Sequence, residues 1–343
     1  MKVSAALPTG VAALLFESAK RRRGMEQRLV ARLAEAGYSE AILPILDYLE
    51  PYESLLTPAS RGELYRFIDR DGEQLALRAD FTPMLARLLA PRLHSMPLPL
   101  RLFYRGDVIR YEEERAGRQR ELFQIGAELL GVPGEPGERE VLRLFLDALA
   151  ASGAGADRPV QVVLGLAGCL DRLLLGCGAA DPMGLASGLA RRDRSEVRRH
   201  CPQLLPIVET GLPEHPEDLG EAEGRRLRGL LALRDEMADL FPNADLFVDL
   251  AEFARHGQDP RLTPEKGDRS YYDGLVFRAF AGPSALPVGG GGRYDRMFRA
   301  LGAEVAAAGF SVSVDRLLEA AVFSPSPGEG DGGAGEGGRG VRS

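Results

Sequence analysis

The chain has 343 residues, of which 45% are hydrophobic and 27% are charged, and its formal net charge is −7. This length and composition allow a large buried core in one or two domains. No run of about 18 apolar residues occurs, which excludes a membrane-spanning helix, and the acidic balance argues against a broad nucleic-acid-binding surface.

The cysteines and histidines do not predict a metal site. Cys169, Cys177 and Cys201 are an odd number at spacings that fit neither a disulfide framework nor a zinc site, so we expect buried thiols. The four histidines are scattered, without metal-ligand spacing. The first ten residues lack the long apolar core of a signal peptide, so the expected location is the cytoplasm.

The first third of the chain predicts a helix followed by strands. An amphipathic helix is expected from about Ala12 to Ala36. The apolar stretch from Glu40 to Leu46 favours a strand near a sheet edge, because it contains Pro44. Residues 64–69 and 74–78 flank an Asp-Gly pair and form the clearest hairpin signal in the sequence.

From Leu100 to Gly131 the sequence predicts a strand, a charged turn and a returning strand. Apolar and polar residues alternate in both strands, so one face of the pair would present polar side chains to a cleft. The alternative is a solvated hairpin whose charges pair with each other. The polar residues that would matter in the first case are Arg110, Glu112, Arg118, Gln124 and Glu128.

The rest of the chain alternates between helices and strands. A helix is expected over 138–151, a strand over 159–165, several short helices from about 168 to 241, strands at 245–250 and 271–280, and a closing helix over 315–322. Read alone, the glycine run 289–292 indicates a plain loop. Strands joined by hairpins predict a mostly antiparallel sheet with helices against it, an α+β fold. The Gly-rich and Pro-rich tail 324–343 is expected to be disordered.

Four blocks resemble those of class II histidyl-tRNA synthetases and occur in the same order. They are Leu77–Pro83 (the amino-acid-binding loop), Tyr104–Glu112 with Gly117-Arg118, Phe123-Gln124 and Glu128 (motif 2), Tyr271–Phe277 (the histidine-specific tyrosine segment), and Gly289–Asp295 with Gly309–Arg316 (motif 3). The resemblance implies one class II synthetase-like domain over 1–323, with residues 168–241 as a helical insertion. It also implies a homodimer through the motif 1 segment at 40–46.

The resemblance also implies a histidine site. Asp80, Thr82 and Gln124 would hold the ammonium and carboxylate end, with Arg110 in the same site. Glu128 and Tyr271 or Tyr272 would meet the imidazole ring. Arg118 and Arg316 would belong to a vestigial nucleotide site. From the residues alone, other roles stay open: Asp80 could cap a helix, the tyrosines could be ordinary strand residues, and Arg316 could pair with Asp315 or Glu319.

The departures from the synthetases argue against aminoacylation. Gly267 stands where their catalytic arginine is expected, and Glu112-Glu113-Glu114 would turn negative charge toward a polyphosphate. No anticodon-binding domain is expected after the tail. The chain therefore looks like the family's non-translating relatives, the regulatory subunits of ATP phosphoribosyltransferase.

That family implies a non-catalytic subunit without a cofactor or metal, in a hetero-oligomer built on a homodimer, with no nucleic-acid or membrane partner. It would be required by a short catalytic subunit in the first step of histidine biosynthesis and for feedback inhibition by histidine. The alternative is an enzyme, either a truncated histidyl-tRNA synthetase or an ATP-dependent amino-acid activating enzyme, that uses Arg110 and Arg316. A third hypothesis is a stand-alone amino-acid sensor.

Overall fold

The computed structural model describes residues 6–56, 61–111, 119–156, 158–169, 174, 182–255 and 272–322. One large sheet contains the strands β1 (Ser39–Glu40), β5 (Leu100–Ile109), β6 (Glu121–Leu130), β7 (Val160–Leu166), β8 (Ala244–Val248), β9 (Leu275–Phe280), β10 (Gly289–Arg293) and β11 (Ala307–Ser313). A small sheet contains β2 (Leu46–Tyr48), β3 (Arg66–Ile68) and β4 (Gln74–Leu77).

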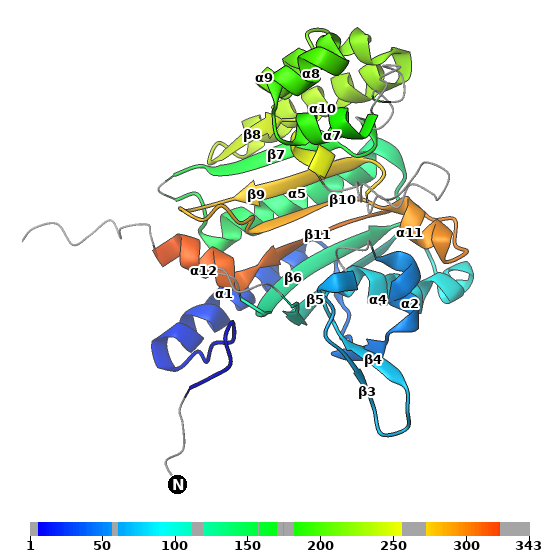
Figure 1. Ribbon diagram of the computed structural model, residues 1–343. Coiled ribbons are helices and arrows are strands. Elements are labelled where there is room, and N and C mark those ends of the chain that lie inside the picture. Colours follow the sequence, from blue (N-terminus) through cyan, green and yellow to red (C-terminus); the bar gives the residue numbers. More distant parts are fainter. Residues whose placement is uncertain are drawn as a thin grey trace, which may run out of the picture.

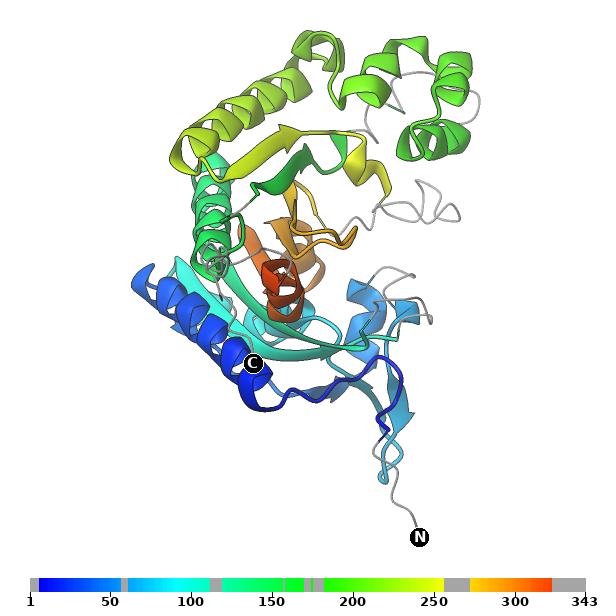
Figure 2. The same ribbon diagram turned by 90° about the vertical axis from the view of Figure 1, so that its left-hand side faces the viewer.

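The α-helices in the described residues are α1 (Phe16–Glu35), α2 (Glu50–Leu55), α4 (Phe81–Leu89), α5 (Gly134–Ser152), α7 (Pro182–Ala190), α8 (Arg194–His200), α9 (Leu205–Thr210), α10 (Glu221–Leu240), α11 (Asp295–Ala300) and α12 (Val314–Val322). Helices α7, α8 and α9 lie at one end of the molecule, beyond β7 and β8, and the small sheet lies at the other end (Figures 1 and 2). No helix of this described part is both long and apolar enough to cross a bilayer.

The large sheet has the strand order β1-β5-β6-β11-β10-β9-β7-β8. Only its end pairs, β1 with β5 and β7 with β8, run parallel, and the strands between them pair antiparallel. The prediction of an α+β fold with a mostly antiparallel sheet is therefore confirmed.

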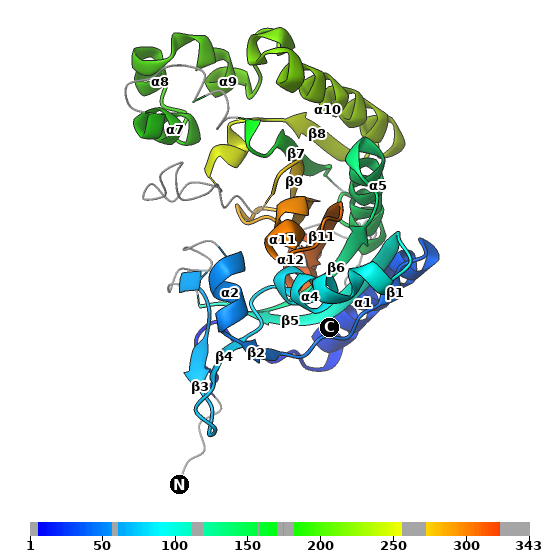
Figure 3. The same cartoon turned by 90° about the vertical axis from the view of Figure 1, so that its right-hand side faces the viewer.

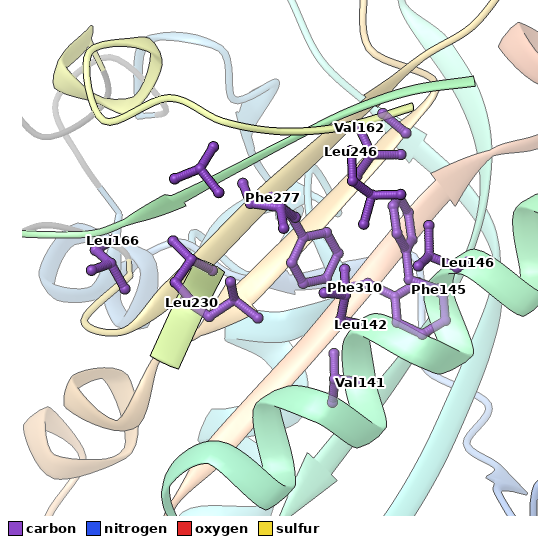
Figure 4. Close-up of a cluster of buried hydrophobic side chains, with 14 of the residues drawn as sticks. Val141, Leu142, Phe145, Leu146, Val162, Leu166, Leu230, Leu246, Phe277 and Phe310 are labelled. Carbon is purple, nitrogen blue, oxygen red and sulfur yellow. The ribbon is translucent and has the colours of Figure 1, made fainter. Parts of the chain in front are cut away.

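The main core lies between one face of this sheet and the helices α1, α5 and α10 (Figure 3). Helix α5 turns an apolar face to the strands, because its buried residues Val141, Leu142, Phe145 and Leu149 recur at three- and four-residue spacings. The ring of Phe145 lies 4.8 Å from that of Phe277 and 5.4 Å from that of Phe310 (Figure 4). Burying each such ring contributes about 1.5–3 kcal/mol, so this packing holds α5 against β9 and β11.

The opposite face of the sheet carries α4 and α11, which pack on Leu130 through Ala86 and Phe298. Alternation along β6 sends Ile125, Ala127 and Leu129 into the main core. The alternate residues of β6, among them Gln124 and Glu128, therefore lie on the face that carries α4 and α11.

Two predictions about local structure are wrong. The stretch 40–46 is not one strand: the chain leaves the edge of the large sheet after Glu40 and enters the small sheet at Leu46. Pro44 has no N–H to continue a ladder, and the carbonyls of Leu43 and Pro44 are bound by the side chain of Arg78 instead. We call residues 41–45 the link.

The glycine run, predicted as a loop, is strand β10. It lies between β9 and β11 and pairs with both, so ladder hydrogen bonds on two sides offset the low strand propensity of glycine.

The other elements lie where the sequence predicts them, with shifted ends. The hairpin is β3–β4, and α7, α8, α9 and α10 fall within 168–241. Cys169 and Cys201 are buried free thiols, as expected. Cys177 and the tail 324–343 lie outside the described residues.

Candidate functional site

The centre of the candidate site is the carboxyl group of Glu128, which is only 1% exposed. Its Oε1 accepts hydrogen bonds from the Thr82 hydroxyl at 2.6 Å and the Tyr104 hydroxyl at 3.2 Å, and its Oε2 accepts from the Tyr294 hydroxyl. These donors come from α4, β5 and the residue before α11. Burial raises the pKa of Glu128 to about 8, although the three hydroxyls favour the charged form.

Gly309 of β11 makes room for this carboxyl. It is the cross-strand partner of Glu128, and a Cβ at this position would lie 1.6 Å from Glu128 Oε2. Only glycine therefore allows the carboxyl to lie across β11 and reach Tyr294.

Asp80 lies beside this group at the start of α4. As the N-cap of that helix, its carboxylate accepts the Thr82 N–H at 3.1 Å, so the capping interpretation is confirmed. Burial raises the pKa of Asp80, and the positive charge of Arg110 opposes that rise. The Arg110 guanidinium is fixed by donating to the Ala79 carbonyl at 2.7 Å.

Tyr272 lies ahead of β9, near the charges of Asp80, Glu128 and Arg110, and is therefore not a strand residue. Burial and the nearby charges of Asp80 and Glu128 raise the pKa of Tyr272, so its hydroxyl stays protonated and can donate a hydrogen bond. The structure thus brings Asp80, Thr82, Arg110, Glu128 and Tyr272 together from separate segments.

Gln124 and Arg316 lie at the far end of the same sheet face. Gln124 is 8% exposed and pairs across the strands with Gly106 and Ser313. Arg316 donates to the Pro287 carbonyl at 2.9 Å. The carboxylate of Asp315 accepts the Phe123 N–H, and that of Glu319 accepts from Gln119.

Sequence reasoning missed Tyr104 and Tyr294 as site residues, although both are buried against Glu128. Both residues lie in segments that resemble the family's motifs: Tyr104 belongs to the alternating polar face of motif 2, and Tyr294 lies within the motif 3 block. Tyr271, Arg118 and the turn 112–114 lie outside the described residues, as does Gly267.

Arg293, the last residue of β10, has a structural role. Its guanidinium donates to Glu138 at 2.9 Å, to Asp295 at 3.1 Å and to the Gly134 carbonyl at 2.6 Å. The carboxylate of Asp273 in turn accepts the Asp295 and Arg296 N–H groups, each at 3.0 Å. This network fixes the backbone beside both Tyr272 and Tyr294.

The arrangement suits a small polar ligand with a positive charge. Two buried carboxyls provide acceptors, while the tyrosine, glutamine and arginine side chains provide donors. Within the described residues, no group of three or more His, Cys, Asp or Glu side chains could hold a metal ion.

Comparisons with known proteins identify the family of the chain. The family model described as histidyl-tRNA synthetase matches residues 10–317. The ATP phosphoribosyltransferase regulatory subunit of Moorella thermoacetica is 34% identical over 91% of this chain and 81% of its own length.

Two solved structures share the fold. One, described as an ATP phosphoribosyltransferase regulatory subunit/histidyl-tRNA synthetase from Bacillus halodurans, has a TM-score of 0.75 at 24% identity and covers 93% of this chain and 84% of that one. A chain of the ATP phosphoribosyl transferase complex from Thermotoga maritima has a TM-score of 0.63 at 20% identity and covers 85% of this chain and 97% of that one. The chain therefore belongs to the histidyl-tRNA synthetase family and, within it, to the ATP phosphoribosyltransferase regulatory subunits.

Proposed function

We propose that this chain is the non-catalytic regulatory subunit of an ATP phosphoribosyltransferase, needed by a short catalytic subunit for the first step of histidine biosynthesis. The observation that carries the proposal is the 34% identity to a named regulatory subunit over 91% of the chain. The complex that it forms with the catalytic subunit is expected in the cytoplasm, where ATP is available.

The geometry supports a role in binding rather than in turnover. The Glu128 carboxyl and the hydroxyls bonded to it are the groups that we propose to line a metabolite-binding pocket. Arg316, the motif 3 arginine that would face a nucleotide, donates to a main-chain carbonyl. Stabilising the transition state of adenylation requires cationic groups that are free to meet phosphate oxygens.

The ligand of this pocket is histidine, acting as a feedback effector. Asp80, Thr82 and Gln124 hold its ammonium and carboxylate end, while Glu128 and Tyr272 meet its imidazole. Both oxygens of Glu128 already accept hydroxyl donors, but an oxygen has two lone pairs, so Oε2 can accept one more N–H. The complete set of proposed histidine-binding residues is Asp80, Thr82, Arg110, Gln124, Glu128, Tyr271 and Tyr272.

A homodimer forms the core of the complex. The outer face of the small sheet is apolar and exposed: Leu46 is 43% exposed, Tyr48 is 54% and Phe67 is 41%. Tyr48 and Phe67 both pair with Leu75, so they lie in one row across the three strands. Ile42 of the link is 89% exposed. Exposed apolar side chains gathered on one face of a sheet are typical of an interface between subunits.

The proposal is tested by co-expressing the chain with the short catalytic subunit and measuring phosphoribosyl-ATP formation. Activity should require this chain and should fall when histidine is added. Activity of the catalytic subunit that is unchanged by the chain would contradict the regulatory role. Histidine-dependent exchange of pyrophosphate with ATP by the chain alone would instead support the activating-enzyme alternative.

A further inference from the structure

Arg78 connects three segments that are far apart in the sequence. It follows β4 directly, and its main chain bonds Ile45 of the link and Ile109 at the end of β5, both at 2.8 Å. Its guanidinium Nη1 donates to the carbonyls of Leu43 at 2.7 Å and Pro44 at 2.8 Å. Nη2 and Nε donate to the Asp107 carbonyl at 2.8 and 3.2 Å.

This guanidinium is buried: Arg78 is 5% exposed, and burial lowers its pKa. Gly106, at φ +149°, permits its approach, since a Cβ there would lie 2.9 Å from Nη2. All four of its hydrogen bonds end on main-chain carbonyls. A buried cation that loses such partners is strongly destabilised, so the link and β5 must keep their positions relative to Arg78.

The same guanidinium also touches the pocket through aromatic rings. It lies over the Phe81 ring at 3.9 Å, and Phe81 stacks on Tyr104 with ring centroids 4.2 Å apart. Tyr104 donates to Glu128, and Leu43 of the link packs against the same aromatic pair. A continuous series of contacts therefore runs from the exposed link to the carboxyl at the centre of the pocket.

We propose that Arg78 is a positioning residue that couples the pocket around Glu128 to the link, and through the link to the exposed apolar face of the small sheet. This inference rests on the proposed function, because it explains how occupancy of the pocket reaches a subunit interface. Arg78 touches no ligand itself: it holds the carbonyls of the link and the Phe81 ring in one arrangement, so a shift of either moves the other.

The test is a double-mutant cycle read by hydrogen exchange of the full chain. Thr82→Val removes a hydroxyl that binds Glu128, so it perturbs the pocket without removing any hydrogen bond of Arg78. Arg78→Lys keeps the positive charge, but an ammonium cannot span the carbonyls of both the link and Asp107. Arg192→Lys is the control for replacing an arginine that donates to a main-chain carbonyl, here that of Val208 in the helical region, and it should leave the effect of Thr82→Val on the link unchanged.

With Arg78 intact, Thr82→Val should raise the exchange rate of amides 41–46 by about 2- to 30-fold. In the Arg78→Lys background, Thr82→Val should change the exchange rates of those amides by less than about 2-fold. If Thr82→Val acts on the link equally in both backgrounds, or in neither, the coupling role is refuted. An Arg78 with only a structural role would give an equal effect of Thr82→Val on the link in both backgrounds. Should Arg78→Lys not fold, Phe81→Leu interrupts the same path one contact later.

L-histidine provides a second measurement that separates this inference from the proposed function. Saturating histidine should slow exchange in 79–86 and in 41–46 of the unmodified chain, but only in 79–86 of the Arg78→Lys variant. Protection of 79–86 without any protection of 41–46 in the unmodified chain would overturn the coupling alone. Absence of protection in 79–86 would overturn histidine as the ligand, and the Thr82→Val cycle would still decide the coupling.

Discussion

At the scale of single residues, Glu128 combines two roles in the same carboxyl. It orients the hydroxyls of Thr82, Tyr104 and Tyr294, and it is the proposed partner of an imidazole. A carboxyl that is buried to 1% exposure is costly to ionise, which is the usual mark of a functional group rather than a stabilising one.

Replacing Glu128 by Ala should abolish the response to histidine. The substitution leaves an imidazole N–H and three hydroxyls without their acceptor, at a cost of about 1–3 kcal/mol for each buried group. Histidine binding measured by titration calorimetry should weaken by at least about 10-fold, which corresponds to 1.4 kcal/mol. Inhibition by histidine that is unaltered in this variant would place the effector elsewhere on the complex.

The raised pKa of Glu128 predicts that the stability of the fold depends on pH. The pKa of Glu128 is about 8 in the folded chain and about 4.5 when unperturbed, so the folded state binds the extra proton between these values. Stability should therefore fall as the pH rises from about 5 to 8, at a slope of up to about 1.4 kcal/mol per pH unit from this group.

Glu128→Gln isolates the contribution of Glu128 to this pH dependence, since a glutamine side chain is isosteric with glutamate and does not titrate. The unfolding free energy of the unmodified chain, measured by urea denaturation, should fall relative to that of Glu128→Gln as the pH rises through this window. A difference between the two proteins that stays constant from pH 5 to 8 would show that the carboxyl keeps its ordinary pKa.

At the scale of elements, the antiparallel pair β6–β11 determines the geometry of the pocket. Register places Gly309 opposite Glu128, and the alternation along β6 turns Glu128 away from the apolar core. A slip of one residue would exchange these faces and bury Glu128 among the aromatic rings of the core.

Gly309→Ala tests this dependence on register. The added methyl group would collide with the Glu128 carboxyl, and overpacking of this kind costs about 1–3 kcal/mol or more. The midpoint of urea denaturation should drop accordingly. The control is Gly229→Ala in α10, where nothing lies within 4 Å of an added Cβ, and this change should stabilise the chain by about 0.5–1 kcal/mol. Equal effects of the two substitutions would contradict the close approach at Gly309.

At the scale of the whole molecule, the link and Arg78 connect the proposed pocket to the apolar face of the small sheet. The link joins the edge of the large sheet to β2, and Arg78 holds it against β5. A regulatory subunit needs such a connection, because an effector can act on its partner only if it favours one arrangement of the complex over another.

Phe67→Asp should dissociate the proposed homodimer without unfolding the chain. Phe67 is 41% exposed, so a carboxylate there is solvated in the monomer but buried and unpaired in the dimer. Sedimentation at several concentrations should show a dimer dissociation constant raised by at least about 10-fold. Phe247→Asp serves as the control, because Phe247 is 50% exposed on β8 at the other end of the large sheet. If both variants remain dimeric, the interface lies on another surface.

The sequence by itself determined the α+β class, the β3–β4 and β5–β6 hairpins, and the helix that follows Asp80. Each depends on local signals: alternation of apolar and polar residues, an Asp-Gly turn, and an N-cap followed by proline in the first turn. The order of the blocks also predicted that Asp80, Glu128 and Tyr272 belong to one site, and the structure brings them close together.

Only the tertiary structure decided the features that depend on contacts between segments distant in the sequence. The run 289–292 contains no strand former, and it becomes β10 because β9 and β11 bond it from both sides. The link is not a strand, since Arg78, more than thirty positions away, binds its carbonyls. Tyr104 and Tyr294 meet Glu128 only once β5, β6 and α11 are assembled. Local propensity acts over a few residues, whereas these contacts join segments that are adjacent only after the chain has folded.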